Sequence, residues 1–364
     1  MTLVIVLAGL FYVAWRIYTI LPFKKWVKVA VLSVYGFALV SFLLTSFGVI
    51  DHLPMPLASF LYVLGNSWLI FVVYAIIIFA VMDVLRLMRL LPGKALKSNI
   101  VSSAVVFGII AVLLTYGAIH YCHKYREEMT IASAKIDAPV KIVLASDLHA
   151  GYHNRHREIA RWVDMINAEQ PDLVLLGGDL VDHSLRAVTA DHDASRLKKL
   201  QAPVYSCLGN HEYYAGVEDA AKFYETAGIT LLKDSLATAC GICIIGRDDA
   251  SNKERKALYK LMKKAPRGQF TLLLDHQPKD LLEAQLEKVD FQFSGHTHSG
   301  QIWPLNWIEK VTFEHSYGPL VKGRTQYYVT SGLGIWGGRF RIGTRSEYLV
   351  LNLVPETPDS TPQK

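Results

Sequence analysis

The sequence predicts an α/β fold that is preceded by a membrane-spanning region of about four helices. Two observations lead to this prediction. Residues before about Lys124 are overwhelmingly apolar and contain four runs close to the roughly 20 residues that a helix needs to cross a bilayer. After them, short apolar strand-like runs alternate with helix-length segments, which is typical of layered α/β domains. At 364 residues, the chain is long enough for both parts.

The membrane-spanning region is expected over residues 1–124. Its apolar runs lie at Leu3–Leu21, Val27–Ile50, Leu57–Leu85 and Ile100–Tyr121. Buried helices of a soluble protein are the alternative, but four such runs without a charged face argue against it. The first run lacks a basic segment before it and a small-residue cleavage site, so we expect a retained helix and not a cleaved signal peptide.

Positive charge predicts the orientation of these helices. The ten basic and four acidic residues through Glu128 account for the whole net charge of +6. The connection between spans two and three has no Lys or Arg. Because basic loops stay in the cytoplasm, both chain ends and the α/β domain are expected on the extracytoplasmic side. Eight basic residues flank the other two connections: Arg16, Lys24, Lys25, Lys28, Arg86, Arg89, Lys94 and Lys97.

The charges also limit the expected partners. The basic residues beside the spans suit anionic lipid head groups, so the lipid bilayer is the expected partner. The rest of the chain has 28 residues of each sign, so no nucleic-acid surface is expected. Asp83 is expected to pair with Arg86 near the interface. The spans show no cluster of paired ionisable residues, which argues against a transport or sensing pathway. The oligomeric state is not indicated.

The remaining elements follow in chain order. Residues 125–139 are expected to be a polar linker, within which Met129–Asp137 alternates like an edge strand, and residues 140–354 are expected to form the α/β domain. The runs 229–232 and 243–245 suggest an antiparallel insertion, with Cys240 and Cys243 at a tight turn, either free or joined in a disulfide. The Pro-rich tail over 355–364 is expected to be disordered. Helices are expected near residues 155–170, 187–200, 217–227, 253–264 and 278–287.

Residue types that bind metals stand at the end of five strand-like segments. In open α/β sheets, ligands bind beyond the carboxyl ends of the strands. The side chains are therefore expected to meet at one site at one edge of a sheet, although each aspartate alone could be a turn former or a helix cap. The five segments end in Asp147-Leu148-His149, Gly178-Asp179, Asn210-His211, Asp275-His276 and His296-Thr297-His298.

The chemistry of this site follows from its residue types. Asp147 and Asp179 are carboxylates, and converging carboxylates repel each other unless a cation lies between them. Imidazole together with carboxylate suits zinc, manganese or iron. The side chains exceed what one tetrahedral ion needs, so two divalent ions that share one carboxylate are expected. Such a pair holds a hydroxide at neutral pH and clamps the attacking and leaving oxygens at phosphorus.

These blocks, in this order, resemble the calcineurin-like metallophosphoesterases. The resemblance covers about Lys141 to Val350. The residues in and around the blocks are most similar to those of the bacterial membrane-associated branch typified by the YkuE and YaeI phosphodiesterases. It implies a four-layer α/β/β/α sandwich with two mixed sheets between helices. One departure is Ser346, where that branch has a proline before Glu347. The blocks are Asp147-Leu148-His149, Gly178-Asp179, Gly209-Asn210-His211-Glu212, His276 and Gly295-His296-Thr297-His298.

The resemblance also implies a role for each residue. Asp147, His149 and His298 would bind the first metal, and Asp179 would bridge the two. The second metal would be completed by Asn210, His276 and His296. The non-ligand histidine beside the substrate would be His211, which would neutralise charge on phosphoryl oxygens or protonate the leaving oxygen. The histidines outside the blocks are expected on the surface or in loops: His153, His156, His183 and His192.

Taken together, the residues and the resemblance imply a membrane-anchored hydrolase that cleaves phosphodiester or pyrophosphate bonds by attack of a metal-bridging hydroxide. A lipid- or envelope-linked substrate is expected. Two alternatives remain: a cytoplasm-facing pyrophosphatase acting on a nucleotide-linked lipid, and a non-catalytic sensor or scaffold on the same fold. Aromatic residues expected near the mouth of the site could be ordinary packing or a surface at the membrane interface. They are Trp303, Trp307, Trp336, Tyr213, Tyr214 and Phe340.

Overall fold

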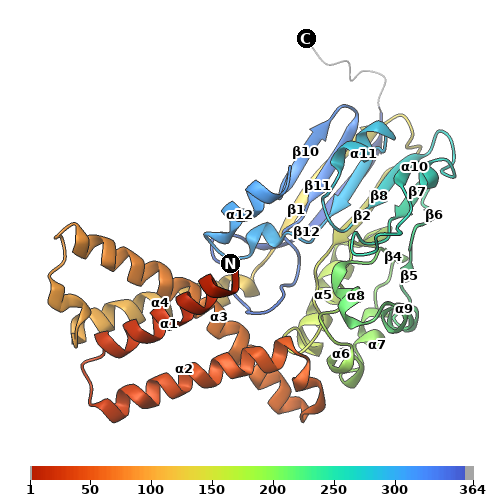
Figure 1. Ribbon diagram of the computed structural model, residues 1–364. Coiled ribbons are helices and arrows are strands. Elements are labelled where there is room, and N and C mark those ends of the chain that lie inside the picture. Colours follow the sequence, from red (N-terminus) through yellow and green to blue (C-terminus); the bar gives the residue numbers. More distant parts are fainter. Residues whose placement is uncertain (1, 357–364) are drawn as a thin grey trace. The chain divides into compact units, whose positions relative to one another are not determined.

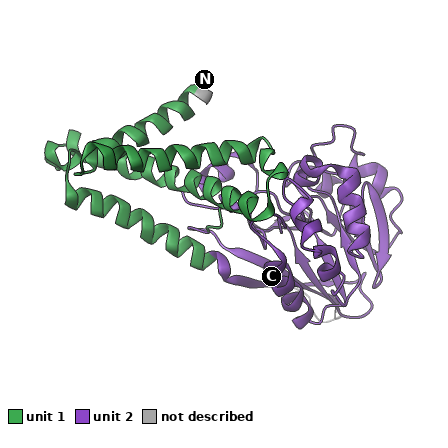
Figure 2. Cartoon of the chain, turned by 90° about the horizontal axis from the view of Figure 1, so that it is seen from below, with its two compact units in different colours: residues 1–120, 337–340 green, residues 121–336, 341–364 purple. Residues whose placement is uncertain are grey.

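The computed structural model describes residues 2–356 and divides the chain into two compact units, shown in Figure 2. Within that range, the helical unit consists of the residues up to 120 together with the segment 337–340. The α/β unit consists of residues 121–336 and those from 341 onward. Residues 357–364, most of the tail expected to be disordered, lie outside the described residues.

The helical unit contains the four expected apolar helices (Figure 1). They are α1 (Thr2–Ile20), α2 (Lys25–Ser46), α3 (Met55–Leu87) and α4 (Ile100–Cys122), with short 3₁₀ turns η1 (Val49–His52) and η2 (Gly93–Leu96) in two connections. By length and composition, α2, α3 and α4 can each cross a membrane, and α1 is a shorter apolar helix over Val4–Ile20. Helix α2 ends before the expected Ile50 because Gly48 adopts a left-handed conformation, φ 68°.

Two features hold these helices against each other. The C-terminal carbonyls of α1 accept hydrogen bonds from the two residues just before α4: Thr19 from the Ser98 amide (2.8 Å) and Ile20 from the Asn99 amide (2.9 Å). These groups have no partner within their own helix, so the contacts satisfy them in place of water. Helices α2 and α3 approach closely at Gly65, where a side chain would overlap the backbone of Phe42.

A partly buried ion pair between helices α1 and α3 corrects one expectation from the sequence. Asp83 pairs with Arg16, and not with Arg86, and it also accepts a hydrogen bond from Tyr12 (2.5 Å). Only 5% of Arg16 is exposed. The predicted partner of Asp83 was therefore wrong, because sequence spacing does not reveal which helix faces meet. Both residues lie about 6 Å from the ends of their helices, where an ion pair can fasten helix to helix.

The first sheet of the α/β unit has six strands in the order β1-β12-β2-β3-β4-β5. Strand β12 runs parallel to β1 and antiparallel to β2, and the pairs from β2 to β5 are parallel. The alternating segment before the domain is indeed an edge strand, but it begins at Lys124, directly after α4. The bounds are β1 Lys124–Ser133, β12 Ser346–Pro355, β2 Val140–Ala145, β3 Leu173–Leu176, β4 Val204–Ser206 and β5 Thr230–Leu231.

The second sheet also has six strands, in the order β10-β11-β9-β8-β7-β6. Its central strands β11, β9, β8 and β7 are parallel, and the outer strands β10 and β6 pair antiparallel. The bounds are β10 Gly318–Lys322, β11 Thr325–Val329, β9 Phe291–Ser294, β8 Phe270–Leu274, β7 Ile242–Gly246 and β6 Ser235–Ala239.

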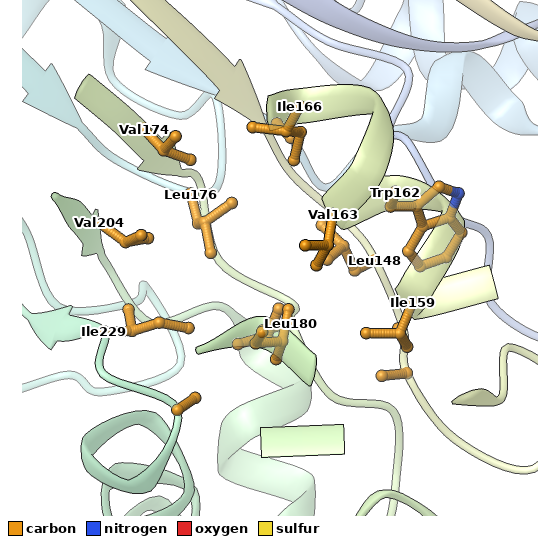
Figure 3. Packing of buried hydrophobic residues seen from close by; sticks show 14 of the residues in the cluster. Leu148, Ile159, Trp162, Val163, Ile166, Val174, Leu176, Leu180, Val204 and Ile229 are labelled. Atoms are coloured by element: carbon orange, nitrogen blue, oxygen red, sulfur yellow. The ribbon is translucent and has the colours of Figure 1, made fainter. Parts of the chain in front are cut away.

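Three apolar layers confirm the expected four-layer sandwich. One layer lies between the two sheets, and another joins the second sheet to helices α10 and α11. The third joins the first sheet to α5 and α9, and Figure 3 shows Val163 and Ile166 of α5 on the side of Leu176 of β3. The helix bounds are α5 His156–Ala168, α6 Arg186–Ala190, α7 Asp193–Leu197, α8 Asn210–Ala215, α9 Val217–Thr226, α10 Leu258–Met262, α11 Leu281–Leu286 and α12 Leu305–Thr312.

Three elements differ from the sequence prediction. The helix expected over 187–200 is two short helices, because His192 between them has a left-handed backbone, φ 55°. The helix expected over 253–264 starts only at Leu258. The runs 229–232 and 243–245 do not form one insertion: β5 pairs in parallel with β4 of the first sheet, and β7 lies in the second. Cys240 and Cys243 are free thiols, and Cys240 lies in the tight β6–β7 turn.

The ion pair of Arg16 and Asp83 gives a stability prediction. Asp83→Asn should destabilise the protein by about 3–5 kcal/mol, because it leaves the Arg16 charge buried without its partner. The double variant Arg16→Met with Asp83→Met removes both charges and should lose distinctly less. Denaturant unfolding in detergent measures both. Equal stability of Asp83→Asn and the wild type would contradict the importance of the pair.

Candidate metal centre

The structure brings all eight predicted site residues to the ends of neighbouring strands. Asp147 and His149 follow β2, and Asp179 follows β3. Asn210 and His211 begin helix α8 shortly after β4. In the second sheet, His276 follows β8, while His296 and His298 follow β9. Because β2, β3 and β4 are parallel, as are β8 and β9, their carboxyl ends open on the same edge of each sheet.

The first group of side chains is Asp147, His149 and His298, all fully or almost fully buried. The Nε2 atoms of the two histidines lie 3.0 Å apart. The Nε2 atom of His298 is 3.4 Å from Oδ1 of Asp147. The donor atoms of the three side chains lie within 4.8 Å of one another, so one cation can contact all of them.

The second group is Asp179, His276 and His296. The Nε2 atom of His276 lies 3.1 Å from Oδ2 of Asp179. Nδ1 of His296 lies 2.8 Å from Oδ1 of Asn210, which adds an amide oxygen to this group. The same Asp179 oxygen is 3.7 Å from Nε2 of His149, so Asp179 reaches toward both groups.

The donor atoms fit bound cations. The carbonyl of Gly177 can only accept, so Nδ1 of His276 donates to it (2.7 Å), which leaves Nε2 facing Asp179. Burial lowers the pKa of His276, but the nearby carboxylates of Asp179 and Asp147 raise it well above its ordinary value, so a proton or a metal ion must stand at Nε2. Burial, together with the charge of Asp179, raises the pKa of Asp147. Oδ2 of Asp147 is buried and accepts no hydrogen bond from the described residues. Lone pairs that face each other in a buried site call for positive charge between them.

The backbone at this site is held in an unusual conformation. Five of the predicted residues have left-handed φ angles: Asp147 (57°), His149 (46°), Asp179 (51°), His296 (71°) and His298 (49°). Such angles are uncommon outside glycine, and each costs about 1–3 kcal/mol. Clustering of this strain at one place is typical of a functional site, where the surrounding structure imposes the geometry.

Two glycines in the sequence blocks are needed for close approach. A side chain at Gly295 would overlap the carboxylate of Asp147, and one at Gly209 would overlap Asp179. At both positions, backbone amides can therefore come close to the carboxylates. The amide of His296 donates to Oδ1 of Asp147 (2.9 Å), and that of His211 donates to Oδ1 of Asp179 (2.9 Å).

Glu212 fixes the loops that carry two of these groups. Its buried carboxylate accepts hydrogen bonds from the backbone amides of Gly209 (2.7 Å), Asp179 (3.0 Å), Leu180 (2.8 Å) and Val181 (3.2 Å). Glu212 therefore joins the loop after β3 to the loop after β4. Glu212 belongs to the block Gly209-Asn210-His211-Glu212, but no role for it was predicted from the sequence.

Sequence reasoning missed Asp182, which lies between two of the site histidines. Its Oδ1 atom is 3.1 Å from Nδ1 of His211 and 3.5 Å from Nδ1 of His149. Burial tends to raise the pKa of Asp182, but hydrogen bonds from His149 and His211 hold it well below its ordinary value. Burial lowers the pKa of His211, yet the charges of Asp179 and Asp182 raise it to about 9. Asp182 follows Asp179 by three residues, a signal that the sequence did offer.

Two further residues hold the backbone of the first group. The Arg341 guanidinium is fully buried and donates to the carbonyls of His298 (2.8 Å) and Gly334 (3.0 Å), and burial lowers its pKa to about 10. The side-chain amide of Asn154 donates to the carbonyl of His149 (3.3 Å), and its oxygen accepts from the hydroxyl of Tyr121 (2.6 Å). Neither residue belongs to a recognisable motif, so neither contact could be predicted from the sequence.

The histidines outside the blocks divide into two kinds. His153 lies in a turn, within the surface-or-loop expectation, but it is buried, and its Nε2 lies 2.6 Å from the carbonyl oxygen of Ile335. His183 is exposed, as expected, and its ring contacts those of His211 (4.9 Å) and Tyr214 (5.3 Å), which also contact each other (5.0 Å). Together with His211, the exposed rings of His183 and Tyr214 form one border of the site.

Comparison with known proteins agrees with this geometry. Residues 140–300 match the sequence profile described as calcineurin-like phosphoesterase. The chain contains a calcineurin-like metallophosphoesterase domain. A metallophosphoesterase of Helicobacter pylori is 35% identical over 238 residues, which cover 63% of this chain and 64% of that protein. The match to a metallophosphoesterase of Campylobacter jejuni is 28% identical and covers 74% of this chain and 76% of that protein.

A vertebrate relative extends the comparison to the membrane. A zebrafish protein named transmembrane protein with metallophosphoesterase domain is 31% identical and covers 68% of this chain and 61% of that protein. Together with the long apolar helices, this match indicates that the helical unit is embedded in a lipid bilayer. The chain spans less than two thirds of the Helicobacter and zebrafish relatives. The bacterial branch suggested by the sequence stays a prediction.

Proposed function

We propose that this protein is a membrane-anchored, dinuclear-metal hydrolase of phosphodiester or pyrophosphate bonds. The observation that supports it best is the arrangement of two groups of buried donor atoms on either side of one carboxylate. Asp179 faces His276 in one group and His149 in the other. A single ion would leave one of these groups without its positive charge.

In this proposal, the roles follow the two groups. Asp147, His149 and His298 hold the first ion, and Asp179 is shared. The second ion is completed by Asn210, His276 and His296. When bound, two divalent ions, whether manganese, zinc or iron, activate water at neutral pH and offset negative charge at phosphorus. Family membership and the donor atoms support divalent metal binding as such.

His211 acts beside this centre as the group that moves a proton. Its ring centroid is 4.4 Å from that of His149, and its Nδ1 faces Asp182. With Nδ1 fixed in this way, Nε2 is the nitrogen left to give a proton to the leaving oxygen. Asp182 orients the ring and stabilises its protonated form. It fixes His149 in the same manner, which leaves Nε2 of His149 for the first ion.

The catalytic domain is proposed to lie on the extracytoplasmic side of the membrane. The ion pair of Arg16 with Asp83 removes one basic residue from the charge comparison. Seven basic residues still flank the connections after α1 and α3, and none lies in the connection between α2 and α3. The connections after α1 and α3 therefore remain more basic than the connection between α2 and α3, which favours the same orientation. A lipid- or envelope-linked phosphoester would be within reach of an enzyme anchored there.

The shared carboxylate gives the most direct test of activity. Asp179→Asn should reduce hydrolysis of bis(p-nitrophenyl) phosphate by at least about a hundredfold and reduce bound metal, because even outer-shell substitutions cost 10–100-fold. Asp164→Asn, an exposed aspartate on α5, is the matched control and should retain activity. Nearly normal turnover by Asp179→Asn would rule out the proposed centre.

A double-mutant cycle tests the roles of His211 and Asp182. His211→Ala should keep its metal and lose about 10²–10⁴-fold in kcat, the usual contribution of a general acid. Asp182→Asn should lose less, and it should also weaken metal binding because Asp182 contacts His149. At saturating metal, adding it to His211→Ala should cost little more in kcat, because its remaining effect acts through the His211 ring. Fully additive losses would show that Asp182 does not work through His211.

Orientation can be tested with reporters joined after Lys364. Alkaline phosphatase, which is active only outside the cytoplasm, should be active in this fusion, and a cytoplasm-dependent fluorescent protein should be dark. The opposite pattern would favour the cytoplasm-facing pyrophosphatase. Fusion in the connection between α1 and α2 is the internal control, since it should give the reverse result.

A further inference from the structure

The segment between β9 and β10 carries an exposed apolar surface. Helix α12 (Leu305–Thr312) exposes Trp307 (58%), Ile308 (59%) and Val311 (89%), which share one face because they stand at positions i, i+1 and i+4. Trp303, 40% exposed, extends this surface and meets Trp307 edge-on with ring centroids 5.6 Å apart. We call these four residues the α12 surface. A continuous apolar surface of this kind marks an interaction site more often than single exposed residues do.

The α12 surface is joined directly to the candidate metal centre. Phe313, the residue after α12, places its ring edge-on to His296, with centroids 5.9 Å apart. The hydroxyl of Thr297 donates to the carbonyl of Ser316 (2.7 Å), which fixes the chain leaving α12 beside the His296–His298 segment. A molecule bound to α12 would therefore lie next to the second group of donor atoms.

Chain connectivity also ties α12 to the helical unit. The amide of Trp303 donates to the carbonyl of Ile342 (2.7 Å), and Gln301 donates to the carbonyl of Trp336 (3.2 Å). Residues 337–340, which lie between these two carbonyls in the chain, belong to the helical unit. There the amide of Gly337 donates to the hydroxyl of Tyr62 on α3 (3.1 Å). Ile342 is two residues beyond this segment, a separation of at most about 7 Å.

We propose that the α12 surface rests in the interfacial layer of the bilayer that holds the helical unit. Tryptophan is favoured there, and a short helix with one apolar face can lie in the plane of the interface. Trp303, at the start of this surface, is hydrogen-bonded to Ile342, which follows the segment 337–340 of the membrane-embedded unit by two residues in the chain. This inference rests on the proposed function where it names the substrate class: an amphiphilic phosphoester whose chains stay in the lipid while its phosphate enters beside His296.

The test places a fluorescent label at position 311 of the full chain. Exposed Cys122 and Cys240 are replaced by serine, and the buried Cys207 and Cys243 remain. Val311→Cys is labelled with bimane and reconstituted into nanodiscs of phosphatidylcholine and phosphatidylglycerol. The control is Leu286→Cys on α11, which is similarly apolar and 68% exposed. Quenching by a doxyl-labelled phospholipid reports contact with lipid at each position.

The proposal expects a blue-shifted emission at position 311 and quenching several-fold stronger than at 286. Equal, weak quenching at both positions would overturn it. A blue-shifted emission at position 311 in detergent without lipid, increasing with protein concentration, would also overturn the proposal. It would indicate contact between two copies of the chain. Hydrolysis of soluble bis(p-nitrophenyl) phosphate by the same samples reports on the metal centre separately. Failure of that activity therefore tests the proposed function and not the position of α12.

Discussion

Electrostatic repulsion within one buried cluster is the constraint on which this structure depends. Asp147 and Asp179 are taken out of water, and imidazole nitrogens lie within 3.1–3.7 Å of their oxygens. A buried anion without a counter-charge is strongly unfavourable, and so are lone pairs that face each other. Positive charge between these groups turns repulsion into attraction. The fold thus holds carboxylate oxygens and imidazole nitrogens close together in an arrangement that is unfavourable without positive charge between them.

Much of the surrounding structure serves to hold these groups in place. Left-handed backbone at five predicted site residues would relax if the loops were free. Glu212 prevents this by accepting four amides from two loops, and Arg341 prevents it by holding the carbonyl of His298. Both are fully buried charged residues whose partners include backbone groups. Such fixed donor sets bind an ion without further ordering of the chain.

The sequence predicted the local features well and the long-range pairings poorly. The four helices follow from apolar runs, and the ligand blocks follow from parallel strands, which bring their carboxyl ends to one edge whatever the exact register. Pairing of Asp83 with Arg16 depends on which helix faces meet, and one sequence does not encode that in its spacing. The placement of β5 in the first sheet and the clamp formed by Arg341 likewise depend on contacts between residues far apart in the chain.

The α12 surface and the metal centre share one short stretch of chain, residues 296–316, which carries two of the proposed metal ligands and the exposed apolar helix. In the proposed function, recognition of an amphiphile and chemistry at its phosphate would thus depend on neighbouring parts of the same segment. Variation in α12 could then change substrate preference without altering the ligand set.

Anomalous X-ray diffraction at the manganese, iron and zinc edges, on crystals of the purified full-length protein, tests the central claim most directly. The account predicts two peaks per chain, one among Asp147, His149 and His298 and the other among Asp179, His276 and His296. It would be contradicted by a single peak or by none after incubation with each metal, with the rings of His149 and His298 hydrogen-bonded to each other instead.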